Sequence, residues 1–281
     1  IRLSLVGSEM CIRDRYSSML LQLMGRPALW INDYLGQLIG LVFDIAESLL
    51  RGKPRWRRFF DQIVEIGFNS QPVVLITGAF VGAVLAAQGL FQLSGLQMES
   101  MGGALVSVGM LRELGPVLTG IMLSGRVGAS MAAEIGTMKV TEQIDALRSM
   151  SVNPIDYLVT PRFLAMLISV PLLITEAAAL GIGAAWIVGT QTFGVSEAWW
   201  SHHTMMHTEL GDIYIALIKG MVFGVLIVVI SCHQGLKANQ GAVGVGRGTT
   251  RAMVYSSLAI LITNFFLTML MNIFLPLGIG N

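Results

Sequence analysis

Four ionisable residues lie inside long apolar runs of the sequence. They are Arg112, Glu113, Glu176 and Lys219. Ionisable side chains at membrane depth usually face a bundle interior or a water-filled cavity. Two interpretations follow: the charges line a substrate route, or they pair between helices, for instance Glu113 with Lys219. Adjacent residues point in different directions on a helix, so Arg112 and Glu113 cannot both serve one contact.

Three histidines, His202, His203 and His207, form a second group of potential ligands. His203 and His207 are spaced as on one face of a helix, where two imidazoles can hold a metal ion. No carboxylate or cysteine completes an evident site, although Glu209 is near. We therefore expect solvated loop histidines and no metal site. The sequence also lacks an evident nucleophile paired with a base, so we predict no catalytic residues and no enzyme.

The glycine-rich run GAVGVGRG, residues 241–248, superficially resembles a nucleotide-binding loop. A true dinucleotide fingerprint follows a strand and opens a helix, whereas this run connects two apolar segments. We interpret it as a flexible cytoplasmic linker. The sequence contains no G-x-x-x-x-G-K-[ST] motif, so the chain cannot be its own P-loop ATPase.

The composition places the chain in a lipid bilayer. Of its 281 residues 54% are hydrophobic and 12% are charged, with a mean hydropathy of +0.69. Soluble domains average roughly 25% charged residues. The net charge of +1, without a basic block interleaved with aromatics, gives no indication of nucleic-acid binding. Cys11 and Cys232 are far apart in the sequence, so a disulfide framework is not expected.

Apolar runs of about 20 residues predict five membrane-spanning helices. Segments with Lys and Arg, such as the run from Arg51 to Arg58, indicate the cytoplasmic side, and loops without them indicate the outside. This rule gives a cytoplasmic N-terminus and an external C-terminus. The first span carries the close-packing pattern GAFVG, and five spans do not form two equal inverted repeats, which weighs against many secondary-transporter folds. The predicted spans are 72–92, 102–128, 161–189, 213–233 and 252–275.

The segment 29–50 predicts an in-plane helix at the membrane surface. Apolar residues recur at helical spacing on one face, and acidic or polar residues mark the other. Residues 1–15 fit neither this pattern nor that of a signal peptide, and we interpret them as extraneous or disordered. This leaves one domain over 16–281, with its transmembrane bundle at 72–275. The apolar face of the in-plane helix comprises Ile31, Leu35, Leu38, Val42, Ile45 and Leu49.

A short amphipathic helix is predicted over 133–150, between the second and third spans. Val140, Ile144 and Leu147 are spaced to form one apolar stripe, and charges of both signs lie off it. Such a helix could float at the bilayer surface. Its mixed charges and its short tethers favour docking into a groove of a cytoplasmic partner.

The segment RELGPVLTGIMLSGRVGASMAAEIGTMKVTEQIDAL resembles the signature of the MlaE-type permeases, the membrane subunits of Mla lipid-transport ABC systems. GAVLAAQG, PRFLAMLISVPLL and RGTTRAMVYSSLAIL resemble further segments of that family in the same order. The resemblance covers 29–275. It implies an all-α integral protein of the bacterial inner membrane, with an interfacial elbow helix, five spans and a cytoplasmic coupling helix.

The same resemblance implies a homodimer that moves phospholipid between the inner and outer membranes. A cytoplasmic ATPase would bind ATP and Mg²⁺, this chain would bind no cofactor, and a periplasmic lipid-binding MCE-domain protein would lie above it. The residues implied in ATPase coupling are Glu134, Lys139, Val140, Glu142, Ile144, Asp145 and Leu147. The candidates for the lipid cavity at the dimer interface are Leu85, Gln88, Glu99, Arg112 and Glu113.

Two alternatives from other classes stay open on the sequence. The chain could be an ATP-independent carrier or channel that uses its buried charges as a relay. It could also be a membrane scaffold that anchors a periplasmic lipid-binding partner.

Overall fold

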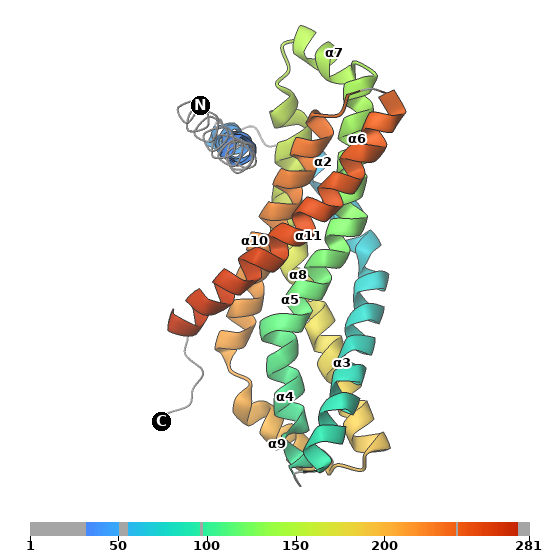
Figure 1. Cartoon of the computed structure of the whole chain (residues 1–281), viewed down its shortest axis with the longest axis vertical. Coiled ribbons are helices and arrows are strands. Elements are labelled where there is room, and N and C mark those ends of the chain that lie inside the picture. The colour runs from blue at the N-terminus through green and yellow to red at the C-terminus, as the bar shows by residue number, and fades with distance from the viewer. Residues whose placement is uncertain (1–31, 51–55, 96–97, 240, 275–281) are drawn as a thin grey trace, which may run out of the picture.

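The five predicted membrane spans are confirmed. The computed structural model describes residues 32–50, 56–95, 98–239 and 241–274, and five helical stretches in it are long and apolar enough to cross a membrane. They follow the long axis of the molecule, and α11 crosses the others obliquely (Figure 1). The spans are built from α3 (Gln71–Ser94), the stretch Glu99–Val140, α8 (Thr160–Ile187) with a turn at each end, α10 (Leu210–Leu236) and α11 (Gly241–Phe274).

The second span is one helical column that contains two wider π-helical turns. Pro116 accounts for the first of them, because it lacks the amide hydrogen that would bond to the carbonyl oxygen of Arg112 four residues earlier. That oxygen is left for a side-chain donor. After the short turn η2 (Glu99–Met101), the column comprises α4 (Gly102–Gly109), η3 (Met110–Leu114), α5 (Gly115–Leu123), η4 (Ser124–Gly128) and α6 (Ala129–Val140).

Small residues allow the first and third spans to approach closely. A Cβ added at Gly82 would lie 2.1 Å from the carbonyl oxygen of Gly181, and one at Gly78 would lie 2.5 Å from that of Ala177. Both distances are far below van der Waals contact, so the backbones can meet only where the side chain is a hydrogen atom. The close packing that GAFVG predicts is confirmed.

The helix predicted over 29–50 is confirmed over the described residues 32–50. It lies across the long axis of the bundle and is seen nearly end-on in Figure 1. Leu41 and Ile45 are buried in the main core, and the hydroxyl oxygens of Ser48 and Thr160 are 2.8 Å apart. The predicted apolar face is divided: Ile45 packs on the bundle, whereas Leu35, Val42 and Leu49 are exposed. Residues 1–15 and 29–31 lie outside the described part.

A second amphipathic helix, α2 (Trp56–Ile66), precedes the first span and has no counterpart among the predicted elements. Phe59 and Ile66 are buried, and the helix packs against α8. A single turn, η1 (Phe68–Ser70), connects it to α3.

The prediction of one helix over 133–150 is wrong. α6 continues the second span to Val140, and a separate short helix, α7 (Gln143–Ser149), follows at the far end of the molecule (Figure 1). Glu142 adopts a left-handed backbone conformation with φ of 59°, which ends the first helix. The periodic stripe continues through this break, so spacing alone could not reveal it.

Three predicted boundaries are also wrong. The glycine-rich run is the first part of α11, not a linker, and it lies against α6, where a Cβ at Gly136 would lie 3.4 Å from Val245. The third span begins with the π-helical turn η5 (Ile155–Val159), several residues before the predicted start at residue 161. Most of the predicted external loop 190–212 is helical, as η6 (Val188–Thr192), α9 (Glu197–His207) and the start of α10.

Candidate functional site

A polar cluster joins three spans around the backbone that Pro116 interrupts. Lys219 on α10 is buried, and its ammonium nitrogen donates to Glu113 Oε1 at 3.0 Å, to Thr268 Oγ1 at 2.8 Å and to the carbonyl oxygen of Arg112 at 2.5 Å. An ammonium group has three donors, and all three are used. The carbonyl that the proline leaves without an amide partner is therefore satisfied by a cation.

Glu113 is held from the other side by α11. Asn264 Nδ2 donates to Glu113 Oε2 at 2.8 Å, and Thr268 Oγ1 is 2.8 Å from Glu113 Oε1. The carboxylate thus has partners on two helices other than its own. Of the two interpretations of these charges, the structure shows the pairing of Glu113 with Lys219.

Arg112 has a different partner, as its position next to Glu113 predicts. Its Nε donates to Asp212 Oδ1, and Asp212 Oδ2 accepts the backbone amide of Glu209 at 3.0 Å. Asp212 is fully buried and completes a capping box at the start of α10. Asp212 falls just before the predicted span 213–233, in a predicted external loop. The pair of acidic residues spaced i, i+3 before a long apolar run was the signal that could have placed it.

These contacts favour pairing between helices as the role of the buried charges. The fourth charge, Glu176 on α8, accepts two hydrogen bonds from Gln71 Nε2 of α3, at 3.2 and 3.3 Å. Removing one member of a buried ion pair leaves the other uncompensated, which costs about 3–5 kcal/mol. The Glu113 side chain is 39% exposed. Breaking its pair with Lys219 should therefore cost about 3 kcal/mol or less.

The five predicted cavity residues do not form one cluster. Leu85 and Gln88 lie on α3, and Glu99 opens η2 near α9; Gln88 and Glu99 are exposed. Arg112 and Glu113 are engaged in the polar cluster between the second, fourth and fifth spans. The interactions described for the chain do not connect these two groups.

The predicted docking stripe faces the protein's own interior. Ile144 is fully buried in the main core, Leu147 packs against that core, and Val140 is half-buried. α7 closes the end of the bundle with its apolar side, so this side is not available to another molecule. The stripe therefore has a structural role in the folded chain.

The opposite face of α7 is polar and open. Asp145 pairs with Lys139 at 3.1 Å and with Arg148 at 3.3 Å, and Glu142 is exposed beside them. Glu134, further along α6, pairs with Arg162 of α8 at 2.6 Å. Among the predicted coupling residues, the charged ones are thus those with a solvent-facing surface.

The histidines lie on a helix and do not gather into a metal site. His203 stacks on Trp199 with ring centroids 5.9 Å apart, and its ring lies 6.0 Å from that of His207. Across the residues that the structure describes, no group of three or more His, Cys, Asp or Glu side chains is arranged to hold a metal ion.

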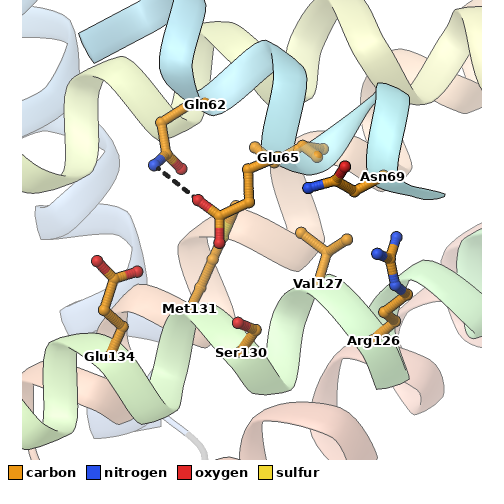
Figure 2. Close-up of a pocket in the computed structure, with 9 residues that line it drawn as sticks. Gln62, Glu65, Asn69, Arg126, Val127, Ser130, Met131 and Glu134 are labelled. Atoms are coloured by element: carbon orange, nitrogen blue, oxygen red, sulfur yellow. Dashed lines mark hydrogen bonds between the residues drawn. The ribbon is translucent and has the colours of Figure 1, made fainter.

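Two adjoining cavities lie along α2 at the α7 end of the bundle. The first, of about 160 Å³, separates α2 from α6; in it Glu65 points from α2 toward α6, and Gln62 Nε2 donates to Glu65 Oε2 at 3.3 Å (Figure 2). The second, of about 450 Å³, reaches the start of α8. Gln62 and Glu134 line both.

The family model described as "Permease MlaE" matches residues 59–270, which cover nearly all of the five spans. The chain belongs to the MlaE permease family. An ABC transporter permease of this family is a multi-pass membrane protein of lipid transport, and the five spans agree with that class.

Relatives of this MlaE-family permease match it over most of their length. A "probable ABC transporter permease protein" of Rickettsia conorii is 43% identical over 245 residues, 87% of this chain and 95% of the relative. A protein of Synechocystis with the same description is 39% identical over 223 residues, 79% of this chain and 85% of the relative. The "intermembrane phospholipid transport system permease protein MlaE" of Haemophilus influenzae is 37% identical over 227 residues, 79% of this chain and 87% of the relative.

Proposed function

We propose that this permease moves phospholipid between the inner and outer bacterial membranes, driven by a separate cytoplasmic ATPase that binds ATP and Mg²⁺. The family match over nearly the whole transmembrane bundle carries this proposal, and the name of the Haemophilus relative gives the substrate class. The ion pairs Arg112–Asp212 and Lys219–Glu113 join the second span to α10, as expected for a permease whose helices stay packed together during conformational change.

The α7 end is the side proposed to face the cytoplasm and the ATPase. It carries exposed charges of both signs, and Met150, just after α7, is 64% exposed. Because Ile144 and Leu147 face inward, the contact would be made by the outer face of α7, with Glu142 and Asp145 as its charged residues. This modifies the groove-docking geometry that the sequence suggested.

The lipid path is proposed to lie between two copies of the chain. α11 presents large apolar side chains along most of its length, and only 11% of its most apolar window is buried within one chain. Such a surface suits either lipid or a second copy. The half-exposed Glu113 contacts Asn264 and Thr268 of this helix. The periplasmic MCE-domain partner would then contact the α9 end.

Capture of the tagged full chain from its native membrane tests the proposal. We expect a P-loop ATPase and bound phospholipid to co-purify, identified by mass spectrometry. Phospholipid without an ATPase would favour an ATP-independent carrier, and the absence of both would favour a scaffold.

Glu142→Lys tests the contact with the ATPase. The substitution reverses an exposed charge on the outer face of α7, so we expect lipid-stimulated ATPase activity to fall several-fold while the permease stays folded and in the membrane. Asp44→Lys reverses an exposed charge on the helix over residues 32–50, outside α7 and α9, and should leave the activity unchanged. Normal stimulation in the Glu142→Lys complex would count against this assignment.

A further inference from the structure

The larger cavity along α2 has a lining of mixed charge that the proposed transport path does not use. It lies between the start of α2, α6 and the start of α8, and its volume is about 450 Å³. We call it the α2 groove. Three arginines and two carboxylates contribute to it. Its lining residues are Arg57, Arg58, Asp61, Gln62, Glu134, Tyr157, Leu158, Pro161 and Arg162.

Arg162 brings an unsatisfied donor to this groove. The residue is 3% exposed, and its Nη2 pairs with Glu134 Oε2 at 2.6 Å. Its Nη1 is buried and has no hydrogen-bond partner within the described structure. A buried guanidinium nitrogen without an acceptor is unfavourable, so this atom indicates that an acceptor from outside the chain completes the site.

Arg58 is held in position on the same groove. It donates to the hydroxyl oxygen of Tyr157, and its guanidinium carbon lies 3.7 Å from the centroid of that ring. A guanidinium has five donors, and this contact leaves others for an anion. A cation fixed by its neighbours loses little entropy when it binds a ligand. Arg57 adds a second positive charge next to it in the sequence.

Asp61 gives the groove a negative charge as well. It is exposed, one turn after Arg57, and the ion pairs described for the chain do not include it. A simple anion would be attracted by the arginines but repelled by this carboxylate. A ligand with both a phosphate and an ammonium group would match both signs.

The neighbouring edge of α2 is apolar and exposed. Trp56, Phe60 and Val64 are 61%, 59% and 54% exposed and lie one helical turn apart. Each directly precedes a polar residue of α2, so an apolar row runs beside the groove. Aromatic side chains of this kind concentrate where the headgroups of a bilayer meet its hydrocarbon.

We infer that the α2 groove binds a zwitterionic aminophospholipid of the cytoplasmic leaflet. Its phosphate contacts Arg58, Arg57 and the Nη1 of Arg162, its ammonium contacts Asp61, and its acyl chains lie along Trp56, Phe60 and Val64. The cytoplasmic assignment rests on the proposed orientation. The binding itself needs neither the ATPase nor transport, so its test can fail while the proposed function holds, and the reverse.

Native mass spectrometry of the purified full chain tests this inference. Dioleoyl phosphatidylethanolamine, phosphatidylglycerol and phosphatidylcholine are titrated separately into the detergent-solubilised protein. We expect phosphatidylethanolamine to bind most tightly. Arg58→Gln should raise its half-saturating concentration about tenfold, because a charge-assisted hydrogen bond is lost. Arg148→Gln removes an exposed arginine at the same end of the molecule, outside the groove, and should leave binding unchanged.

Asp61→Asn tests the proposed contact with the ammonium group separately from the contacts with the phosphate. It should abolish the preference for phosphatidylethanolamine over phosphatidylglycerol while retaining binding through the phosphate. Equal binding by the Arg58→Gln and Arg148→Gln variants would overturn the site. So would displacement of the lipid by millimolar inorganic phosphate, which would identify a soluble anion as the ligand. Contact of Arg58 with a co-purified protein subunit, in place of lipid, would also overturn the inference.

Discussion

Lys219 is the residue on which the polar cluster between the spans depends. Its ammonium group contacts Glu113, Thr268 and the Arg112 carbonyl oxygen at once, and it lies in the apolar interior of the bundle. A neutral side chain of similar length would leave a carboxylate and a backbone carbonyl with fewer donors. The cluster therefore acts as a unit that ties α10 and α11 to the second span.

Lys219→Met should destabilise the protein by about 3 kcal/mol, because it breaks a buried ion pair while leaving its carboxylate in place. Thermal unfolding in detergent, followed by intrinsic fluorescence or light scattering, measures the change in Tm. Lys237→Met removes an exposed lysine at the end of the same helix and serves as the control. A Tm for Lys219→Met equal to that of the control would show that the pair is not stabilising.

The sequence predicted part of this cluster and missed the rest, for physical reasons. Hydrocarbon offers few partners, so a lysine and a glutamate in separate apolar runs are expected to meet, as Glu113 and Lys219 do. Asn264 and Thr268 carry no charge and are not distinctive in an apolar run. Asp212 lies at the very start of a helix, where hydropathy falls and a loop is the simpler interpretation.

At the scale of elements, the α3–α8 pair is the most extensive contact between described helices. Gly82→Ala tests the requirement for its glycines, since the added Cβ would lie 2.1 Å from the carbonyl oxygen of Gly181 and must push the helices apart. We expect a loss of about 1–3 kcal/mol, the range for overpacking, measured as a lowered Tm.

Gly183→Ala is the matched control on α8. Nothing lies within 4 Å of a Cβ at that position, and alanine favours helix over glycine by about 1 kcal/mol, so the variant should be neutral or slightly more stable. Equal losses in the Gly82 and Gly183 variants would mean that close approach of α3 and α8 does not contribute to stability.

The spans could be predicted from the sequence because a helix of about 20 consecutive apolar residues is long enough to cross the hydrocarbon core of a bilayer. Their interruptions did not. The break at Glu142 leaves the spacing of Val140, Ile144 and Leu147 intact, and it depends on one left-handed residue. The helical state of residues 241–248 runs against the low helix propensity of glycine and reflects packing of α11 on α6, which is a tertiary effect.

At the scale of the whole molecule, positive charge is concentrated at one end. Arginines and lysines of α2, α6, α7 and the α10–α11 turn all lie toward α7, whereas α9 and its flanking turns, residues 193–211, carry none. The positive-inside rule therefore predicts that the α7 end faces the cytoplasm and the α9 end faces the outside. The groove along α2 and the outer face of α7 would then share one compartment with the ATPase.

Single-cysteine labelling tests this orientation in a chain that carries Cys11→Ser and Cys232→Ala. His207→Cys on α9 and Ser149→Cys on α7 place exposed thiols at opposite ends of the bundle. In spheroplasts, a membrane-impermeant maleimide should label the His207→Cys thiol, and it should reach the Ser149→Cys thiol only after the membrane is disrupted. Inverted membrane vesicles should give the opposite pattern. Labelling of Ser149→Cys in sealed spheroplasts would reverse the assignment, and with it the side on which an ATPase can meet α7.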